Sequence, residues 1–194
     1  IQFELEHKII QILLLYGNVE QEFEDVMLKA DEEGELKEVL EKNNVKVFQR
    51  IYLSLQEDEI ELSNPLFLKI YKDIMDFYHQ NENFVLEQYL MRLDEELAQE
   101  VTTVLMNEER EVLHNWESQN IIVKQKNESI AQYVTETILT LRWYWVNNII
   151  DDLKNQVTSK KVEDNSEALS MVMDYLGLTN MFSKKLGRVI SRYS

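Results

Sequence analysis

The sequence predicts an all-α fold: a helical bundle, then a long connecting helix and a C-terminal antiparallel helical hairpin. The 194 residues include only four Gly and one Pro, so the residues that commonly mark turns and strand ends are scarce. Leu, Glu, Lys, Gln and Met, which favour helices, are abundant. Apolar residues also recur at helical spacing along most of the chain.

Residues 1–128 are predicted to form the bundle. The segment "FELEHKIIQILLLYGN" carries apolar residues at helical spacing, and Gly17 followed by Asn18 ends this first helix. The very acidic residues 20–43 predict one or two short helices that break near Gly34. A further helix is predicted within 43–59 behind an Asn cap, and its apolar face consists of Val47, Ile51 and Leu55.

The clearest helix start in the chain is Ser63-Asn64-Pro65, where a capping residue precedes a proline at the first helical position. Two further helices are predicted around 83–92 and 94–107, the second behind an Asp94 cap. Residues 108–126 show no clear periodicity, and we expect them to be irregular.

Residues 129–194 are predicted to form the helical hairpin. Two apolar stripes at helical spacing flank a polar connector that begins near residue 155. The first stripe is Ile130, Val134, Ile138, Leu141, Trp145, Ile149 and Leu153, and the second is Ala168, Val172, Tyr175, Leu178, Phe182, Leu186, Val189 and Tyr193. Gly177 and Gly187 are expected inside the second helix, with Gly177 a candidate for a kink.

Charge also separates the two parts. The formal net charge is −16, and residues 1–128 carry 12 basic and 29 acidic side chains, whereas residues 129–194 carry 8 and 7. We therefore expect a domain boundary between residues 128 and 129. A body this acidic repels phosphate, so direct nucleic-acid binding by the bundle is not expected.

The C-terminal segment is basic although the chain is acidic. Lys184, Lys185, Arg188 and Arg192 fall in the last eleven residues, and no Asp or Glu follows Asp174. Cations at a helix C-terminus favourably oppose the helix dipole, which is one explanation for them. The other is an interaction surface, for which the candidate partner-binding residues are Tyr175, Lys184, Lys185, Arg188, Arg192 and Tyr193.

An alternative hypothesis is a metal-dependent helical-bundle enzyme. Glu4-x-x-His7 and Glu111-x-x-His114 have the spacing by which di-iron bundles present a carboxylate and an imidazole from one helix face. Asp76-x-x-His79 has the same spacing, which favours ordinary acid–histidine pairing on solvated helix faces. We therefore expect no cofactor, no metal and no catalytic residues in this chain. The absence of Cys fits a reducing compartment, and we expect a cytoplasmic location.

Five segments in this order resemble the C-terminal region of bacterial replicative primases of the DnaG type. They are "EHKIIQILLLYGN", "EIELSNPLFLKIYKDIMDFY", "REVLHNWESQNIIV", "ETILTLRWYWVNNIIDDL" and "SKKLGRVI". The resemblance covers nearly the whole chain, with little contribution from residues 18–42. The motifs are not catalytic, so the specificity of the resemblance comes from their number and order.

The resemblance implies a helicase-binding domain whose C-terminal hairpin engages the N-terminal domains of the hexameric, DnaB-type replicative helicase. Such a domain places primase at the replication fork and does not itself catalyse synthesis. The family's zinc-binding and polymerase domains would precede this region in a longer chain, which agrees with a sequence that begins at Ile1 rather than Met. A third hypothesis is a self-associating, regulatory all-α domain whose hairpin packs against its own copy.

Overall fold

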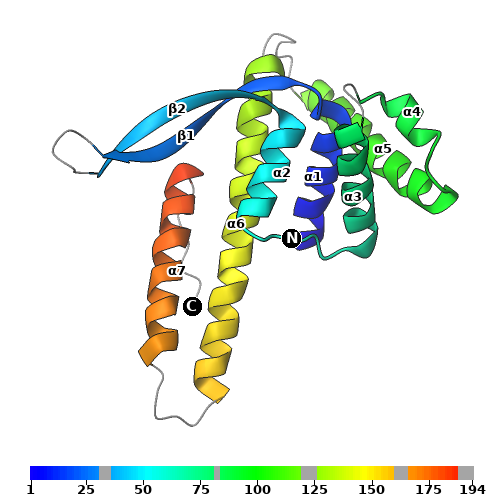
Figure 1. Ribbon diagram of the computed structural model, residues 1–194. Coiled ribbons are helices and arrows are strands. Elements are labelled where there is room, and N and C mark those ends of the chain that lie inside the picture. The colour runs from blue at the N-terminus through cyan, green and yellow to red at the C-terminus, as the bar shows by residue number, and fades with distance from the viewer. Residues whose placement is uncertain (31–35, 81–83, 119–125, 160–165, 188–194) are drawn as a thin grey trace. The chain divides into compact units, whose positions relative to one another are not determined.

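The computed structural model describes residues 1–30, 36–80, 84–118, 126–159 and 166–187. These residues are mostly helical, and they include one two-stranded antiparallel sheet (Figure 1). The elements are α1 (Gln2–Tyr16), β1 (Glu20–Ala30), β2 (Leu36–Lys46), α2 (Val47–Glu57), α3 (Pro65–Gln80), α4 (Leu86–Leu90), α5 (Glu95–Ser118), α6 (Lys126–Ser159) and α7 (Ser166–Lys185).

The chain divides into two compact units. The larger unit is Glu6–Val134, and the smaller unit combines Ile1–Leu5 with Thr135–Ser194. Both α1 and α6 are continuous helices that contribute residues to each unit. The assignment of residues 1–128 and 129–194 to separate domains stays a prediction.

Much of the core of the larger unit comes from α1, α2 and α3. These helices carry aliphatic and aromatic side chains at helical spacing, so each helix has an apolar face that must leave water. The fully buried residues are Ile9, Ile10, Ile12 and Leu13 on α1, Val47 and Ile51 on α2, and Phe67, Ile70 and Ile74 on α3. The apolar face predicted for residues 43–59 is confirmed, because Leu55 is buried as well.

Tyr78 joins α3 to the end of α1. Its ring stacks on Phe48 at 4.2 Å and on Phe84 at 4.8 Å between ring centroids. Its hydroxyl donates a hydrogen bond of 3.1 Å to the carbonyl oxygen of Leu13. A Cβ atom at Gly17 would overlap this hydroxyl, so the close approach of α3 requires glycine at that position.

The start of α3 is held by two acceptors. The Asn64 side-chain oxygen accepts hydrogen bonds from the Leu66 and Phe67 backbone N–H groups, at 2.9 and 3.2 Å. The buried Glu6 carboxylate of α1 accepts three more, from the Ser63 N–H at 2.9 Å, the Ser63 hydroxyl at 2.8 Å and the Asn64 N–H at 2.9 Å. The predicted helix start at Ser63-Asn64-Pro65 is confirmed, and a residue far away in the sequence strengthens it.

The predicted Asp94 cap of α5 is also confirmed. Its Oδ1 accepts a hydrogen bond of 2.9 Å from the Leu97 N–H, and its Oδ2 lies 3.0 Å from the Lys69 Nζ. These contacts, the Leu97 hydrogen bond first, lower the pKa of Asp94 from its usual value.

The helix α5 continues through Ser118, so the prediction of irregular structure from 108 to 118 is wrong. Residues 119–125 lie outside the described residues.

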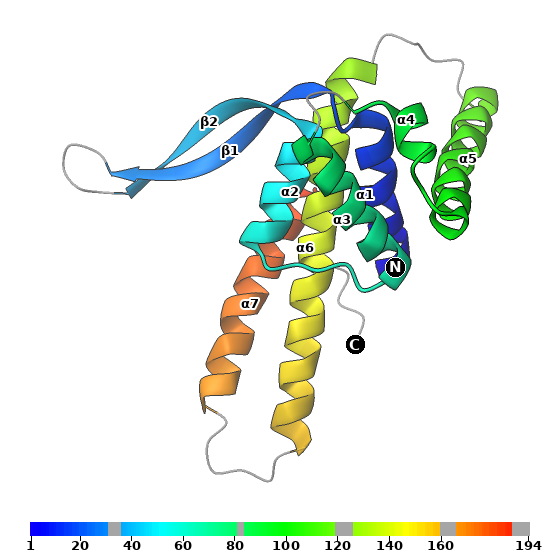
Figure 2. The same cartoon turned by 45° about the vertical axis from the view of Figure 1, so that its right-hand side comes forward.

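The all-α prediction is wrong for residues 20–46. Where short helices were predicted, β1 and β2 form an antiparallel ribbon whose register runs from Glu20 opposite Lys46 to Ala30 opposite Leu36. Both views show the ribbon extending away from α1, α2 and α3 (Figures 1 and 2). The predicted break at Gly34 lies outside the described residues.

Cross-strand and tertiary contacts explain the ribbon. Phe23 is buried beneath the Arg50 guanidinium, whose centre lies 5.3 Å from the ring centroid. Arg50 also makes two hydrogen bonds to Asp25, at 2.6 and 2.8 Å, and Lys42 of β2 lies 2.7 Å from Glu22 of β1. These pairs join residues on β1 to β2 and α2, so they override a composition that locally favours helix.

In the smaller unit, α7 runs beside the C-terminal part of α6 and in the opposite direction in both views (Figures 1 and 2). The predicted stripe of α6 is buried at Ile138 and Leu141, but it shifts by one residue near its end, where Ile150 is buried and Ile149 is exposed. The helix α7 continues through Gly177. It ends before Gly187, which takes a positive φ of 63°, so the prediction that this glycine lies inside the helix is wrong.

Within the described residues, no helix combines the length and the apolar character that crossing a membrane would require.

Candidate functional site

A row of exposed apolar side chains in the smaller unit lies on α7. Leu169, Met173 and Leu176 are 52%, 73% and 41% exposed, and their spacing of four and three residues puts them on one helix face. We call these three residues the α7 stripe. Two side chains on a neighbouring face of the same helix, Val172 and Phe182, are buried. The helix therefore has one apolar face that is covered and another that meets solvent.

The predicted basic residues adjoin this stripe at the end of α7. Lys184 and Lys185 are exposed in its last turn, and Lys184 follows Met173 by about three helical turns, which places both on the same side. Gly187 ends the helix with a hydrogen bond of 3.1 Å from its N–H to the Lys184 carbonyl oxygen. Tyr175 is half-buried. Arg188, Arg192 and Tyr193 lie outside the described residues.

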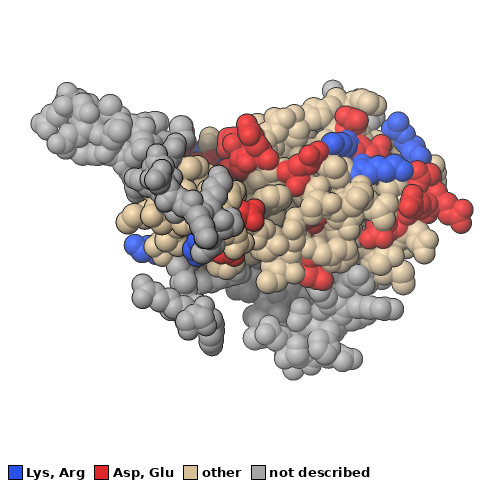
Figure 3. All heavy atoms as spheres, turned by 90° about the horizontal axis from the view of Figure 1, so that it is seen from below, with Lys and Arg blue, Asp and Glu red and all other residues tan. Residues whose placement is uncertain are grey.

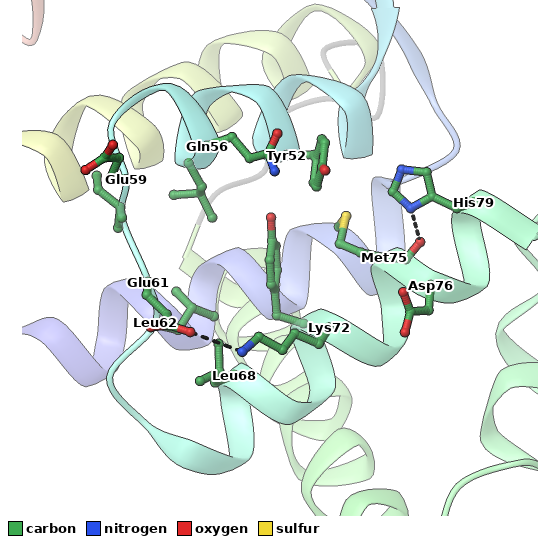
Figure 4. A pocket seen from close by; sticks show the side chains of 13 residues that line it. Tyr52, Gln56, Glu59, Glu61, Leu62, Leu68, Lys72, Met75, Asp76 and His79 are labelled. Atoms are coloured by element: carbon green, nitrogen blue, oxygen red, sulfur yellow. Dashed lines mark hydrogen bonds and ion pairs between the residues drawn. The ribbon is translucent and has the colours of Figure 1, made fainter.

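A second feature, which the sequence did not reveal, is a groove of about 830 Å³ between α2 and α3 (Figure 4). It lies entirely within the larger unit. The loop that joins the two helices closes one side. Its lining comprises Tyr52, Leu55, Gln56, Glu59, Ile60, Glu61, Leu62, Leu68, Tyr71, Lys72, Met75, Asp76 and His79.

The groove has a buried apolar floor and polar ends. Leu55, Leu62 and Met75 are almost completely buried. Figure 4 shows Glu59 and Glu61 toward one end of the groove and Asp76 and His79 toward the other. Glu61 is paired with Lys72 across 3.1 Å.

Aromatic side chains form part of the groove wall. The Tyr52 ring meets the His79 imidazole edge-on at 5.3 Å between centroids, and the His79 Nδ1 lies 2.7 Å from the Met75 carbonyl oxygen. Burial, with a smaller contribution from nearby Tyr52, raises the pKa of Tyr71 to about 12. Tyr71 therefore stays a neutral phenol, able to donate and to accept hydrogen bonds, at any physiological pH.

A signal for the groove was present in the sequence. Leu68, Tyr71, Met75 and His79 follow one another at steps of three, four and four residues on α3. They form a second face beside the core face that contains Phe67, Ile70 and Ile74. A helix with two apolar faces suggests two neighbours, and here the second face borders a groove.

Residues 3–189 match the model of a protein family described as a domain of unknown function, DUF8430. The chain belongs to this family. No curated protein and no solved structure matches the chain.

The candidate metal ligands of this DUF8430 chain do not form a described cluster. Glu4 is exposed on α1, and the half-buried His7 meets the Phe67 ring edge-on at 6.0 Å. The side chains of Glu111 and His114 are outside the described part of the chain. Within the described residues, no group of three or more His, Asp or Glu side chains is arranged to hold a metal ion.

Acidic side chains outnumber basic ones in this DUF8430 chain. The formal net charge is −16. Acidic side chains are spread over the described part of the face in Figure 3, with a few basic ones among them. Such a surface favours basic partners and disfavours phosphate.

Proposed function

We propose that this chain is a non-catalytic interaction domain of a bacterial DNA primase. In this proposal it binds the N-terminal domains of the hexameric, DnaB-type replicative helicase in the cytoplasm and brings primase to the replication fork. The order of the five sequence segments supports the assignment to primase. The observation that carries the interaction role is the exposed α7 stripe.

The α7 stripe has the chemistry of a docking surface. Three large apolar side chains in line on one helix face are unfavourable in water, and covering each completely contributes about 1.5–3 kcal/mol. Because these side chains are already partly covered, each would contribute less. Together they would still supply the apolar centre that protein interfaces require.

The proposal also assigns roles to the two helices. Here α6 and α7 act as a helical hairpin, with α7 presenting its stripe and its basic end to the helicase. The polymerase activity is assigned to other domains of primase.

The decisive experiment measures the affinity of the full chain for the N-terminal domain of the replicative helicase of the same organism by isothermal titration calorimetry. Met173→Asp places a charge in the middle of the stripe, so we expect binding to weaken at least tenfold, which is about 1.4 kcal/mol. The matched control is Met91→Asp, because Met91 is 85% exposed but lies in the larger unit. We expect the control to bind like the unchanged chain.

The same stripe would also serve self-association, and light scattering separates the two roles. If the unchanged chain is a dimer that Met173→Asp converts to a monomer, and neither binds helicase, the regulatory self-associating domain replaces the helicase adaptor. If Met173→Asp and Met91→Asp bind helicase equally well, the α7 stripe is not the interface.

A further inference from the structure

We infer that the groove between α2 and α3 is a second docking site, which takes a basic amphipathic segment of a partner protein. This site is separate from the α7 stripe and extends the proposed function. The inference rests on the shape of the groove, on its apolar floor and on the position of its charges.

The groove suits an apolar side chain. Its floor of Leu55, Leu62 and Met75 is already built and buried, so an entering leucine or phenylalanine would contact carbon on several sides. Its volume of about 830 Å³ holds more than one such side chain. Tyr52 and Tyr71 contribute aromatic rings to the wall of the groove. Both apolar groups and cations make favourable contacts with such rings.

The charges select a basic occupant. Of the four Asp, Glu and Lys side chains that line the groove, Glu61 and Lys72 form an ion pair. Glu59 and Asp76 are exposed and form no ion pair with another described residue, so they leave the groove negative toward both ends. Arginine or lysine of the partner would meet these carboxylates, while an acidic segment would be repelled.

The positions of the charges also define the pattern of the occupant. Because Glu59 and Asp76 lie toward opposite ends of the groove, the best occupant has basic residues on both sides of an apolar centre (Figure 4). The shorter wall, α2, has 11 residues, which is about 16 Å of helix at 1.5 Å per residue. A partner helix of three to four turns would fill this length.

The test uses a library of random 14-residue peptides displayed on phage and selected against the full chain at about 50 mM salt, where surface charges are weakly screened. We expect enrichment of peptides in which lysine or arginine brackets leucine, phenylalanine or tryptophan. A synthetic copy of the most enriched peptide is then titrated, and we expect the Met75 methyl resonance to shift as the peptide binds.

Two charge variants locate the binding. Glu59→Lys combined with Asp76→Lys should weaken the peptide at least tenfold. The control, Glu87→Lys combined with Glu96→Lys, changes the net charge equally at exposed positions on α4 and α5, and it should weaken binding less than threefold. All four positions are exposed, so the variants should fold.

Four results would overturn the inference. They are a selection without enrichment, enriched peptides without basic residues, an equal loss of affinity in the two charge variants, and a loss of binding in Met173→Asp, which would place the peptide on the α7 stripe. Because the helicase titration uses a different ligand, the adaptor role can fail while the groove still binds its peptide, or the reverse.

Discussion

Replacing the buried Glu6 of α1 by glutamine should destabilise the chain. The Glu6 side chain is only 1% exposed. Its Oε1 accepts hydrogen bonds from the Ser63 N–H and hydroxyl, and its Oε2 accepts one from the Asn64 N–H. Glutamine has the same shape, but its amide NH₂ must face one of these donors.

The magnitude follows from the contacts that are lost. Each hydrogen bond to a charged group contributes about 1.5–3 kcal/mol, and a negative charge at the start of a helix adds about 0.3–1 kcal/mol. Glutamine loses at least one of the hydrogen bonds and the charge. Ser63 is exposed, so water replaces part of the loss. We expect the free energy of unfolding to fall by about 2–4 kcal/mol.

Thermal and urea unfolding followed by circular dichroism measure this effect. For a chain of this length, 1 kcal/mol corresponds to roughly 2–4 °C in Tm, so we expect Tm to fall by about 4–16 °C. The control is Glu4→Gln, since Glu4 lies on the same helix but is exposed. If both variants unfold within about 1 °C of each other, the Glu6 carboxylate does not hold the start of α3.

Three further predictions concern glycines, pH and salt. Gly17→Ala should destabilise by at least about 1–3 kcal/mol because its Cβ would overlap the Tyr78 hydroxyl. Gly177→Ala should instead stabilise by up to about 1 kcal/mol, because a Cβ there has open space within a helix; urea unfolding of both variants tests the opposite signs. The pKa of Asp94 is lower in the folded chain than its usual 3.8, so its stabilising contribution is present above pH 3.8 and is lost as the pH falls through the lower folded value. The Tm difference between the unchanged chain and Asp94→Ala should therefore be largest near neutral pH and shrink below pH 3.8, whereas a pH-independent difference would contradict this reasoning. Lys184→Glu combined with Arg188→Glu should weaken helicase binding, more strongly at 50 mM than at 500 mM salt; calorimetry at both concentrations measures it, and unchanged affinity would remove the basic end of α7 from the interface.

The helices of this chain were predictable where local signals agree. At Ser63-Asn64-Pro65 and at Asp94, a capping side chain comes directly before apolar residues at helical spacing, and both helices start as expected. The ribbon was not predictable in this way, because Glu, Lys and Leu favour helix locally. The contacts that stabilise it join residues far apart in the sequence, as where Arg50 contacts both Phe23 and Asp25. No local pattern carries such a contact.

The candidate sites divide similarly. Lys184 and Lys185 stand out in the sequence because they interrupt an acidic chain, and they prove to be exposed at the end of α7. The exposure of the α7 stripe could not be predicted from the sequence. Apolar residues at helical spacing predict a buried face, and only the arrangement of the helices shows which face is covered. The groove depends on the loop between α2 and α3, whose course no periodicity describes.

The exposed surface of α7 has a chemical consequence that follows from its methionines. Met171, Met173 and Met181 are exposed on this one helix, whereas Met75 is almost completely buried. The flexible thioether of methionine adapts to differently shaped partners, and oxidants convert it to a polar sulfoxide. Oxidants would therefore act on α7 before they reach the core. Peroxide treatment should reduce helicase binding while leaving Tm nearly unchanged, and methionine sulfoxide reductases should restore it.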